Sequence, residues 1–201
     1  MRELGRVVAV LRAADPAHVL STVAAVLAAG VPAAEITSTT PDFERLLAAA
    51  AAAHDAPIGA GTILSGEMAR RALAAGARFL VTPTVELDVI AVANEAGVPV
   101  LCGAFSPTEV RQAWVAGADA VKLFPARIGG PAYVRDLLGP FPDLRLVPSG
   151  GVGPADAGDY LRAGAVAVAV GGSVLTPALR YGDAAETRRR CAALLAGLDR
   201  P

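Results

Sequence analysis

The chain has 201 residues, of which 54% are hydrophobic and 18% are charged, and its formal net charge is −1. This length fits one domain with a substantial core, and we expect residues 1–201 to form a single domain. The near-neutral charge and the 4% aromatic content argue against a nucleic acid or an acidic membrane surface as a partner.

Segment lengths and cysteine usage predict a reduced cytoplasmic protein without a membrane anchor. The longest uncharged stretches, residues 19–34 and 163–179, are shorter than a bilayer span of about 20 residues and contain Gly and Pro. Residues 1–6 include a charge pair, which is atypical of a signal peptide. Cys102 and Cys191 lack metal-ligand spacing, and two cysteines in a chain of this size favour free thiols.

Short apolar or β-branched runs alternate with alanine-rich segments along the whole chain. Such alternation predicts parallel strands covered by helices. Eight runs indicate a (β/α)8 TIM barrel, and its loops must be short because such barrels typically take about 250 residues. The expected strands are residues 7–12, 33–37, 58–62, 79–83, 98–103, 120–125, 144–149 and 166–171.

Glycine and proline mark the expected helix ends. An Ala-Gly pair precedes five strands, at residues 29–30, 75–76, 96–97, 116–117 and 163–164. Glycine there accepts the left-handed conformation that ends a helix. Helix starts are expected at Asp15-Pro16, Thr40-Pro41, Ser106-Pro107 and Gly153-Pro154. A last helix is expected over residues 183–198, and we interpret its three arginines, residues 188–190, as a solvated face.

Lys122 is the only lysine, since the other 17 of the 18 basic residues are arginine. It lies in an apolar run that is typical of a buried strand. Burial favours the neutral amine, which is the form that attacks a carbonyl carbon to give a Schiff base. The alternative is a structural lysine that reaches solvent from a strand end or pairs with a carboxylate.

Polar side chains end the first three expected strands, where barrels carry their chemistry. Glu35 could move the protons that Schiff-base chemistry requires, or form an ion pair at the rim. Thr62 could hold a substrate carboxylate, with close backbone approach at Gly59 and Gly61. Arg12 could bind a carboxylate or phosphate, or be a surface arginine. His18 and His54 lie far apart without neighbouring ligands, so no metal site is expected.

Two glycine pairs follow the seventh and eighth expected strands, each beside a serine. Backbone N–H groups of such loops converge on anions, and loops after these two strands often bind phosphate in this fold. Simple turns are the alternative. The expected phosphate-binding residues are Ser149, Gly150, Gly151, Gly171, Gly172 and Ser173.

These segments resemble the family of 2-keto-3-deoxy-6-phosphogluconate (KDPG) aldolases and 4-hydroxy-2-oxoglutarate (KHG) aldolases. Residues 117–130, which include Lys122, fit the Schiff-base signature of that family. Residues 59–62, 81–83, 149–151 and 171–173 fit its other strand ends in order, so the resemblance spans essentially the whole chain. It implies a class I aldolase without metal or other cofactor, assembled as a homotrimer.

The resemblance also implies roles for individual residues. Lys122 would form an imine with pyruvate, and Glu35 would shuttle protons through a water molecule. Thr62 would hold the pyruvyl group beside Pro83 and Phe124, and the glycine loops would hold the distal phosphate of the keto acid.

One position departs from the family pattern. Thr39 stands where the family usually has an arginine that binds the keto-acid carboxylate, and Arg12 could supply that charge. Relatives that act on the galactonate epimer also depart here, so residues 38–41 slightly favour that epimer.

Three functions remain open from the sequence. The first is cleavage of a 2-keto-3-deoxy-6-phospho sugar acid to pyruvate and glyceraldehyde 3-phosphate. The second keeps the chemistry on an unphosphorylated substrate such as 4-hydroxy-2-oxoglutarate. The third is a barrel that isomerises or only binds sugar phosphates, with Lys122 acting as a charge.

Overall fold

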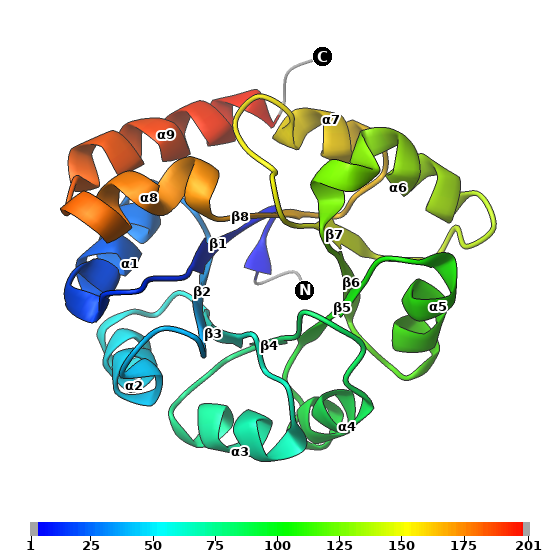
Figure 1. The fold of residues 1–201 in the computed structure, drawn as a ribbon, viewed down its shortest axis with the longest axis horizontal. Helices are drawn as coiled ribbons and strands as arrows, with labels where there is room; N and C mark the ends of the chain where they lie inside the picture. The colour runs from blue at the N-terminus through cyan, green and yellow to red at the C-terminus, as the bar shows by residue number, and fades with distance from the viewer. Residues whose placement is uncertain (1–3, 199–201) are drawn as a thin grey trace.

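The computed structural model describes residues 4–198, which form a (β/α)8 barrel (Figure 1). Eight parallel strands pair in the order β7-β6-β5-β4-β3-β2-β1-β8. A bridge between Ser149 and Ala169 joins the two outer strands and nearly closes the barrel. The strands are β1 (Val7–Leu11), β2 (Ala33–Thr37), β3 (Ile58–Gly61), β4 (Leu80–Val81), β5 (Val100–Ala104), β6 (Ala120–Leu123), β7 (Leu146–Pro148) and β8 (Val168–Val170). The predicted fold class is therefore confirmed.

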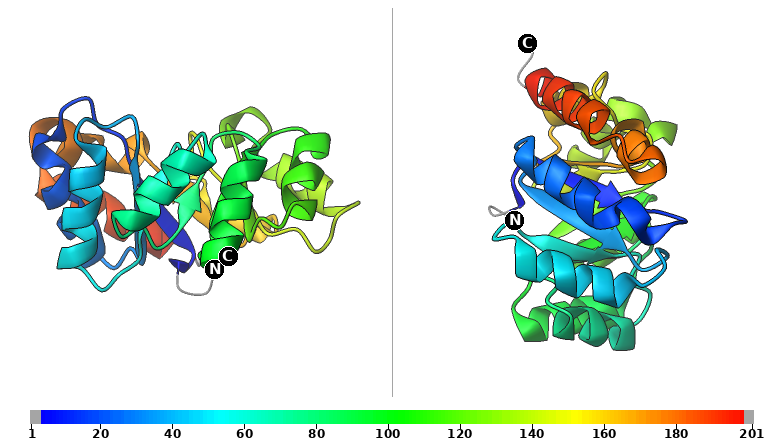
Figure 2. Two further views of the ribbon diagram at one scale, coloured as in Figure 1. Left: turned by 90° about the horizontal axis from the view of Figure 1, so that it is seen from below. Right: turned by 90° about the vertical axis from the view of Figure 1, so that its left-hand side faces the viewer.

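A helix follows every strand, and the helices cover the outside of the barrel (Figure 2). They are α1 (Val19–Ala28), α2 (Phe43–Ala53), α3 (Gly66–Ala74), α4 (Leu87–Ala96), α5 (Pro107–Val115), α6 (Gly130–Leu138), α7 (Ala157–Arg162), α8 (Gly172–Tyr181) and α9 (Ala184–Gly197). Two 3-10 helices, η2 (Pro16–His18) and η3 (Ala126–Ile128), precede α1 and α6. Within residues 4–198, each helix is too short or too polar to cross a bilayer.

Alternation along the strands divides the buried side chains between two cores, because successive strand residues point to opposite faces. One face packs against the helices, and the other fills the barrel. The ring of Phe79 occupies the barrel interior beside Gly59, where an added Cβ would lie 2.3 Å from the ring. The interior core consists of Leu4, Val8, Ala33, Phe79, Val81, Leu101, Ala120, Val147, Ala167 and Ala169.

Several predicted boundaries differ from the structure by one or two residues. Arg12, Thr62 and Pro83 were expected to end strands, and each lies just beyond its strand. The staggered register of a barrel leaves strand ends without ladder partners, so the paired segments are shorter than the apolar runs. The polar residues thus sit on the loops at the barrel mouth. The prediction that the chain lacks a signal peptide was based on residues 1–6. Of these, residues 1–3 lie outside the described part of the chain.

Two of the four predicted helix starts are wrong. Helix α2 begins after Asp42, and the hydroxyl of Thr40 instead accepts a hydrogen bond from the Ala13 amide at 3.3 Å. Helix α7 begins after Asp156, whose carboxylate accepts a hydrogen bond from Gly153 N at 2.8 Å. In both places an extra turn precedes the helix, which proline spacing alone does not reveal.

Other helix boundaries agree with prediction. Ser106 and Glu109 form a reciprocal capping box on α5, and Asp15 accepts a hydrogen bond from the Ala17 amide at 2.9 Å. The five repeat glycines all have φ between 67° and 107°, so each adopts the left-handed conformation expected at a helix end. Helix α9 lies within the expected residues 183–198, and Asp183 caps it.

Candidate active site

Lys122 points into the barrel from β6 and is 6% exposed. It shares the inward face of β6 with Ala120, which belongs to the interior core, because the two residues are two positions apart. Its Nζ atom lies 6.0 Å from the centroid of the Phe124 ring. The prediction of a buried lysine is confirmed. Of the two structural alternatives, a side chain that reaches solvent is wrong, whereas pairing with a carboxylate does occur.

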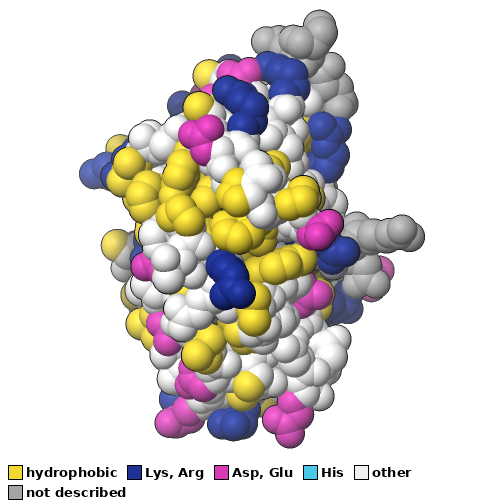
Figure 3. Space-filling model, turned by 90° about the vertical axis from the view of Figure 1, so that its right-hand side faces the viewer, with side chains coloured by type: hydrophobic (Ala, Val, Ile, Leu, Met, Phe, Trp, Pro, Cys, Tyr) yellow, Lys and Arg dark blue, Asp and Glu magenta, His cyan; other side chains and the backbone are white. Residues whose placement is uncertain are grey.

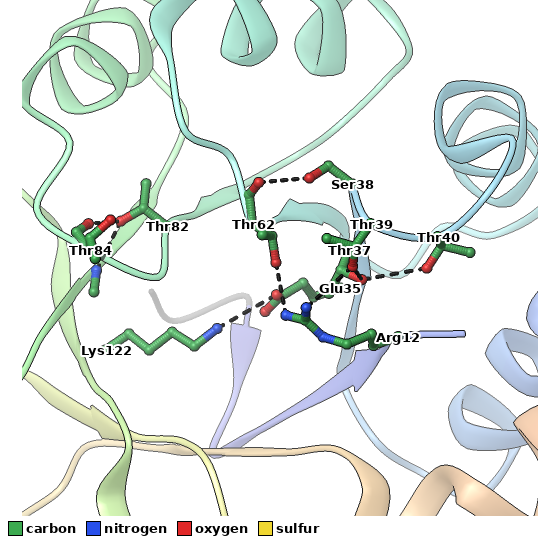
Figure 4. A network of polar contacts seen from close by, with 11 residues as sticks. Arg12, Glu35, Thr37, Ser38, Thr39, Thr40, Thr62, Thr82, Thr84 and Lys122 are labelled. Carbon is green, nitrogen blue, oxygen red and sulfur yellow. Dashed lines mark hydrogen bonds and ion pairs between the residues drawn. The ribbon is translucent and has the colours of Figure 1, made fainter. Parts of the chain in front are cut away.

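Glu35 faces Lys122 from β2 (Figure 4). Its carboxylate is buried, and Oε1 lies 3.6 Å from Lys122 Nζ. Neither carboxylate oxygen accepts a hydrogen bond from any described residue. Burying a carboxylate without hydrogen bonds costs free energy, so this arrangement points to chemistry rather than to stabilisation of the fold. The alternative of a rim ion pair with an arginine does not occur within residues 4–198, and Glu35 is interior.

A glycine in β3 makes room for the Glu35 carboxylate. Gly61 pairs with Thr37 in the ladder, and a Cβ atom added at Gly61 would lie 1.8 Å from Glu35 Oε1. From the sequence, we expected a substrate carboxylate to approach the backbone closely at this glycine. In the structure, the carboxylate of Glu35 makes that approach.

Arg12 bridges two threonines at the barrel mouth. Its Nη1 donates to Thr39 Oγ1 at 3.2 Å, and its Nη2 donates to Thr62 Oγ1 at 3.0 Å. Figure 4 shows the hydrogen bonds of Arg12 and, separately, the ion pair of Lys122 with Glu35. Within the part of the chain that the structure describes, no carboxylate lies within ion-pair distance of Arg12. Its charge is therefore available to an anion in the barrel mouth.

Thr62 adopts an unusual backbone conformation. Its φ of 58° is in the left-handed region, which β-branched residues rarely enter. The hydroxyl of Ser38 donates to the Thr62 carbonyl oxygen at 2.7 Å, and Arg12 holds the Thr62 hydroxyl. These contacts keep the Thr62 side chain at the edge of the cavity that contains Lys122.

The cavity around Lys122 has a volume of about 380 Å³. It brings together all predicted site residues except Glu35, which lies against Lys122, and Thr39, which contacts Arg12. Val10 and Val152 complete the wall and were not singled out from the sequence, because apolar residues there look like ordinary core. The lining residues are Val10, Arg12, Thr62, Pro83, Lys122, Phe124, Ser149, Gly150, Gly151, Val152, Gly171, Gly172 and Ser173.

The two glycine loops are linked to each other. Gly150 and Gly151 have φ of 86° and 94°, and added Cβ atoms would meet the Phe124 ring at 2.9 Å and the Arg127 side chain at 2.7 Å. Ser173 Oγ donates to the carbonyl oxygen of Val152 at 2.7 Å, which ties the second loop to the first. The Gly172 and Ser173 amides open helix α8, where N–H groups lack partners within the helix. Both loops thus border the cavity, and the second places the N-terminus of α8 there.

Metal-ligating clusters do not occur within residues 4–198: no group of three His, Cys, Asp or Glu side chains is placed to hold an ion.

Comparisons with known proteins agree with this site. The model of the KDPG and KHG aldolase family matches residues 1–189. A probable 2-dehydro-3-deoxy-6-phosphogalactonate aldolase of Rhizobium meliloti is 34% identical, and the match covers 96% of this chain and 91% of that protein. A 2-dehydro-3-deoxy-phosphogluconate aldolase of Pseudomonas aeruginosa is 36% identical, and the match covers 92% of this chain and 85% of that protein. The solved structure of the 2-keto-3-deoxy-6-phospho-gluconate aldolase from Zymomonas mobilis superimposes with a TM-score of 0.85 at 30% identity, covering 96% of this chain and 93% of that one.

The barrel, its buried amine and these relatives together define an aldehyde-lyase. More specifically, the chain belongs to the KDPG and KHG aldolase family. The family resemblance drawn from the sequence is confirmed.

Proposed function

We propose that this chain catalyses the reversible class I cleavage of 2-dehydro-3-deoxy-6-phosphogluconate, or of its galactonate epimer, to pyruvate and glyceraldehyde 3-phosphate. One observation carries the proposal. The Lys122 amine and the Glu35 carboxylate lie 3.6 Å apart, and the amine opens into the cavity that both glycine loops border. A nucleophile, an acid/base group and an anion site are thus within reach of one small keto acid.

The reaction begins when the neutral Lys122 amine attacks the C2 keto carbon. Loss of water from the carbinolamine gives a protonated imine, which attracts electrons from the neighbouring carbon. The C4 hydroxyl gives up its proton, the C3–C4 bond breaks, the aldehyde leaves and the bond electrons form an enamine. Protonation at C3 and hydrolysis of the imine then release pyruvate and restore the amine. Glu35 accepts and returns these protons, through a water molecule where the distance requires one.

Arg12 and Thr62 hold the keto-acid carboxylate in this proposal, with Thr39 fixing the guanidinium through its hydroxyl. The support is the pair of hydrogen bonds that Arg12 donates, at 3.2 Å to Thr39 and 3.0 Å to Thr62. Arg12 thus replaces the arginine that the family resemblance expects at position 39. Pro83 and Phe124 form the wall beside the pyruvyl group.

The amides of the two glycine loops hold the substrate phosphate. Support comes from their place on the same cavity as Lys122 and from the helix start at Gly172.

A comparison of substrates tests the proposed function. We expect kcat/KM for pyruvate release to be at least about a hundredfold higher for the 6-phosphorylated keto acid than for its unphosphorylated analogue, since two charge-assisted hydrogen bonds contribute about 1.5–3 kcal/mol each. The gluconate and galactonate epimers should be assayed side by side to identify the preferred C4 configuration. Equal values for phosphorylated and unphosphorylated compounds would instead favour 4-hydroxy-2-oxoglutarate as the substrate type.

We further propose that the chain forms the homotrimer that its family resemblance implies. An exposed apolar face supports self-association: Figure 3 shows hydrophobic side chains gathered on the side of the barrel that carries α5 and α6. Leu87, Val115 and Ile128 are 49%, 68% and 66% exposed in the isolated chain. Contiguous exposed apolar surface of this kind usually marks an interface.

The assembly is testable by light scattering. We expect three times the chain mass for the wild type and a lower mass for Val115→Glu, because the new carboxylate would lose its hydration in a buried interface. Leu20→Glu on α1, at a position 37% exposed, is the matched control and should leave the mass unchanged. A monomeric wild type would refute the trimer.

We also propose that residues 1–201 act as one domain and that the protein is cytoplasmic. Both cysteines are free and buried, and burial raises the pKa of the Cys191 thiol to about 11. Burial likewise raises the pKa of Cys102. Protonated, enclosed thiols fit a reducing compartment.

A further inference from the structure

Helix α8, which begins at the second glycine loop, contains a proline in its interior. Pro177 has no backbone N–H, so the carbonyl oxygen of Ser173, four residues earlier, loses its usual partner within the helix. Ser173 lies on the substrate cavity, and its hydroxyl donates to the Val152 carbonyl of the other glycine loop. The carbonyl that lacks a partner within the helix is therefore in the first turn of α8, where the proposed phosphate site lies.

Helix α9 supplies the missing partner. Arg190 Nη1 donates to the Ser173 carbonyl oxygen at 3.1 Å, and Arg190 Nε donates to Glu186 Oε1 at 2.8 Å. The carboxylate of Glu186 is also paired with Arg189 at 2.6 Å, so the guanidinium of Arg190 is held at a fixed orientation. Residues 188–190 do face solvent as interpreted, but the Arg190 side chain, 41% exposed, also bonds the backbone of α8.

A second α9 side chain bonds the α8 backbone just after the proline. Thr187 is fully buried, and its hydroxyl accepts a hydrogen bond from the Ala178 amide at 3.1 Å. Helices α8 and α9 lie side by side on the outside of the barrel (Figure 1). Two side chains of α9 thus bond the backbone of α8 on both sides of the position where proline interrupts the helix.

We propose that Arg190 is a positioning residue for phosphate recognition, acting through the Ser173 carbonyl on the amides of Gly172 and Ser173. Its bond fixes the peptide between Ser173 and Val174, which directly follows these two amides, and its charge adds to the positive end of the helix. The proposal rests on the proposed function, since it requires that these amides bind the substrate phosphate. The family model matches residues 1–189, so Arg190 lies beyond the segment which that model describes.

The test compares Arg190→Ala with Arg188→Ala, which removes the same charge from an exposed position on the same helix. We expect Arg190→Ala to raise KM for the phosphorylated substrate about fivefold to tenfold, the effect of losing one hydrogen bond of ordinary strength. The kcat value, the KM for the unphosphorylated analogue and borohydride trapping of pyruvate on Lys122 should change less than about twofold. Arg188→Ala should match the wild type, and Arg190→Lys should recover part of the loss because lysine can still donate to the carbonyl.

A proline replacement isolates the mechanism. Pro177→Ala restores an amide that can bond to Ser173 within the helix, so Arg190→Ala should have little effect on KM in that background. Equal effects in both backgrounds would overturn the role of the carbonyl.

The remaining outcomes are also decisive. A loss shared equally by both substrates, together with a lower melting temperature, would make Arg190 merely structural and overturn the proposal. A wild type that does not prefer the phosphorylated substrate would overturn the proposed phosphate site, and this inference with it. A wild-type preference whose size is unchanged in Arg190→Ala would overturn this inference alone.

Discussion

Replacing Lys122 by arginine should abolish pyruvate release, with a fall in kcat on the order of 10⁴ or more, because a guanidinium stays protonated and forms no imine. Arginine keeps a positive charge beside Glu35, so the loss reports the chemistry rather than a broken ion pair. Borohydride treatment with pyruvate should add one reduced pyruvyl group to the wild type and none to Lys122→Arg, as measured by intact mass.

The control for this prediction adds a lysine elsewhere. Arg111→Lys places a second primary amine on the exposed surface of α5, and its intact mass should still increase by a single adduct. An adduct on Lys122→Arg would show that pyruvate binds covalently at another group. A variant that remains active without an adduct would favour a sugar-phosphate barrel in which residue 122 serves only as a charge.

Glu35→Gln should lower kcat by about 10²- to 10⁴-fold, because the amide cannot carry protons to and from the imine and the enamine. The KM should change much less, since Glu35 lies against Lys122 rather than on the cavity wall. Steady-state kinetics on the phosphorylated substrate would measure both values, and thermal melting would check that the variant is folded.

A backbone change tests the same carboxylate without altering it. Gly61→Ala puts a methyl group where Glu35 Oε1 now lies, 1.8 Å from the expected Cβ position, so the carboxylate must move away from Lys122. We expect a loss of kcat similar to that of Glu35→Gln. Gly139→Ala at the end of α6 is the matched control, because its nearest heavy atom would be 3.5 Å away. Normal turnover by Gly61→Ala would argue that the observed position of Glu35 is not needed for catalysis.

The sequence was sufficient to predict the barrel and its buried amine. Strand periodicity and the glycine repeat depend on local physics, namely on which residues favour burial and which accept a positive φ. Lys122 stood out because one cation in an apolar run has few structural explanations. The glycine pairs could be placed because the fold brings the ends of all its strands to one mouth.

The sequence did not reveal how the polar residues are held there. Arg12 and Thr62 are 50 positions apart, and no local pattern indicates that one side chain holds the other. The positive φ of Thr62 contradicts its residue preference and depends on contacts from Ser38 and Arg12. Likewise, Arg190 looked like one of three surface arginines, because its partner is a carbonyl group freed by a proline 13 positions away.

Lys122 is the only lysine of the chain, and it is buried. An enzyme that releases a reactive aldehyde is exposed to glycation of its own amines, which over many turnovers could block surfaces and crosslink neighbouring molecules. Here every other basic side chain is arginine, whose guanidinium does not form an imine with a simple aldehyde at neutral pH. The exterior therefore offers its own product no lysine to modify.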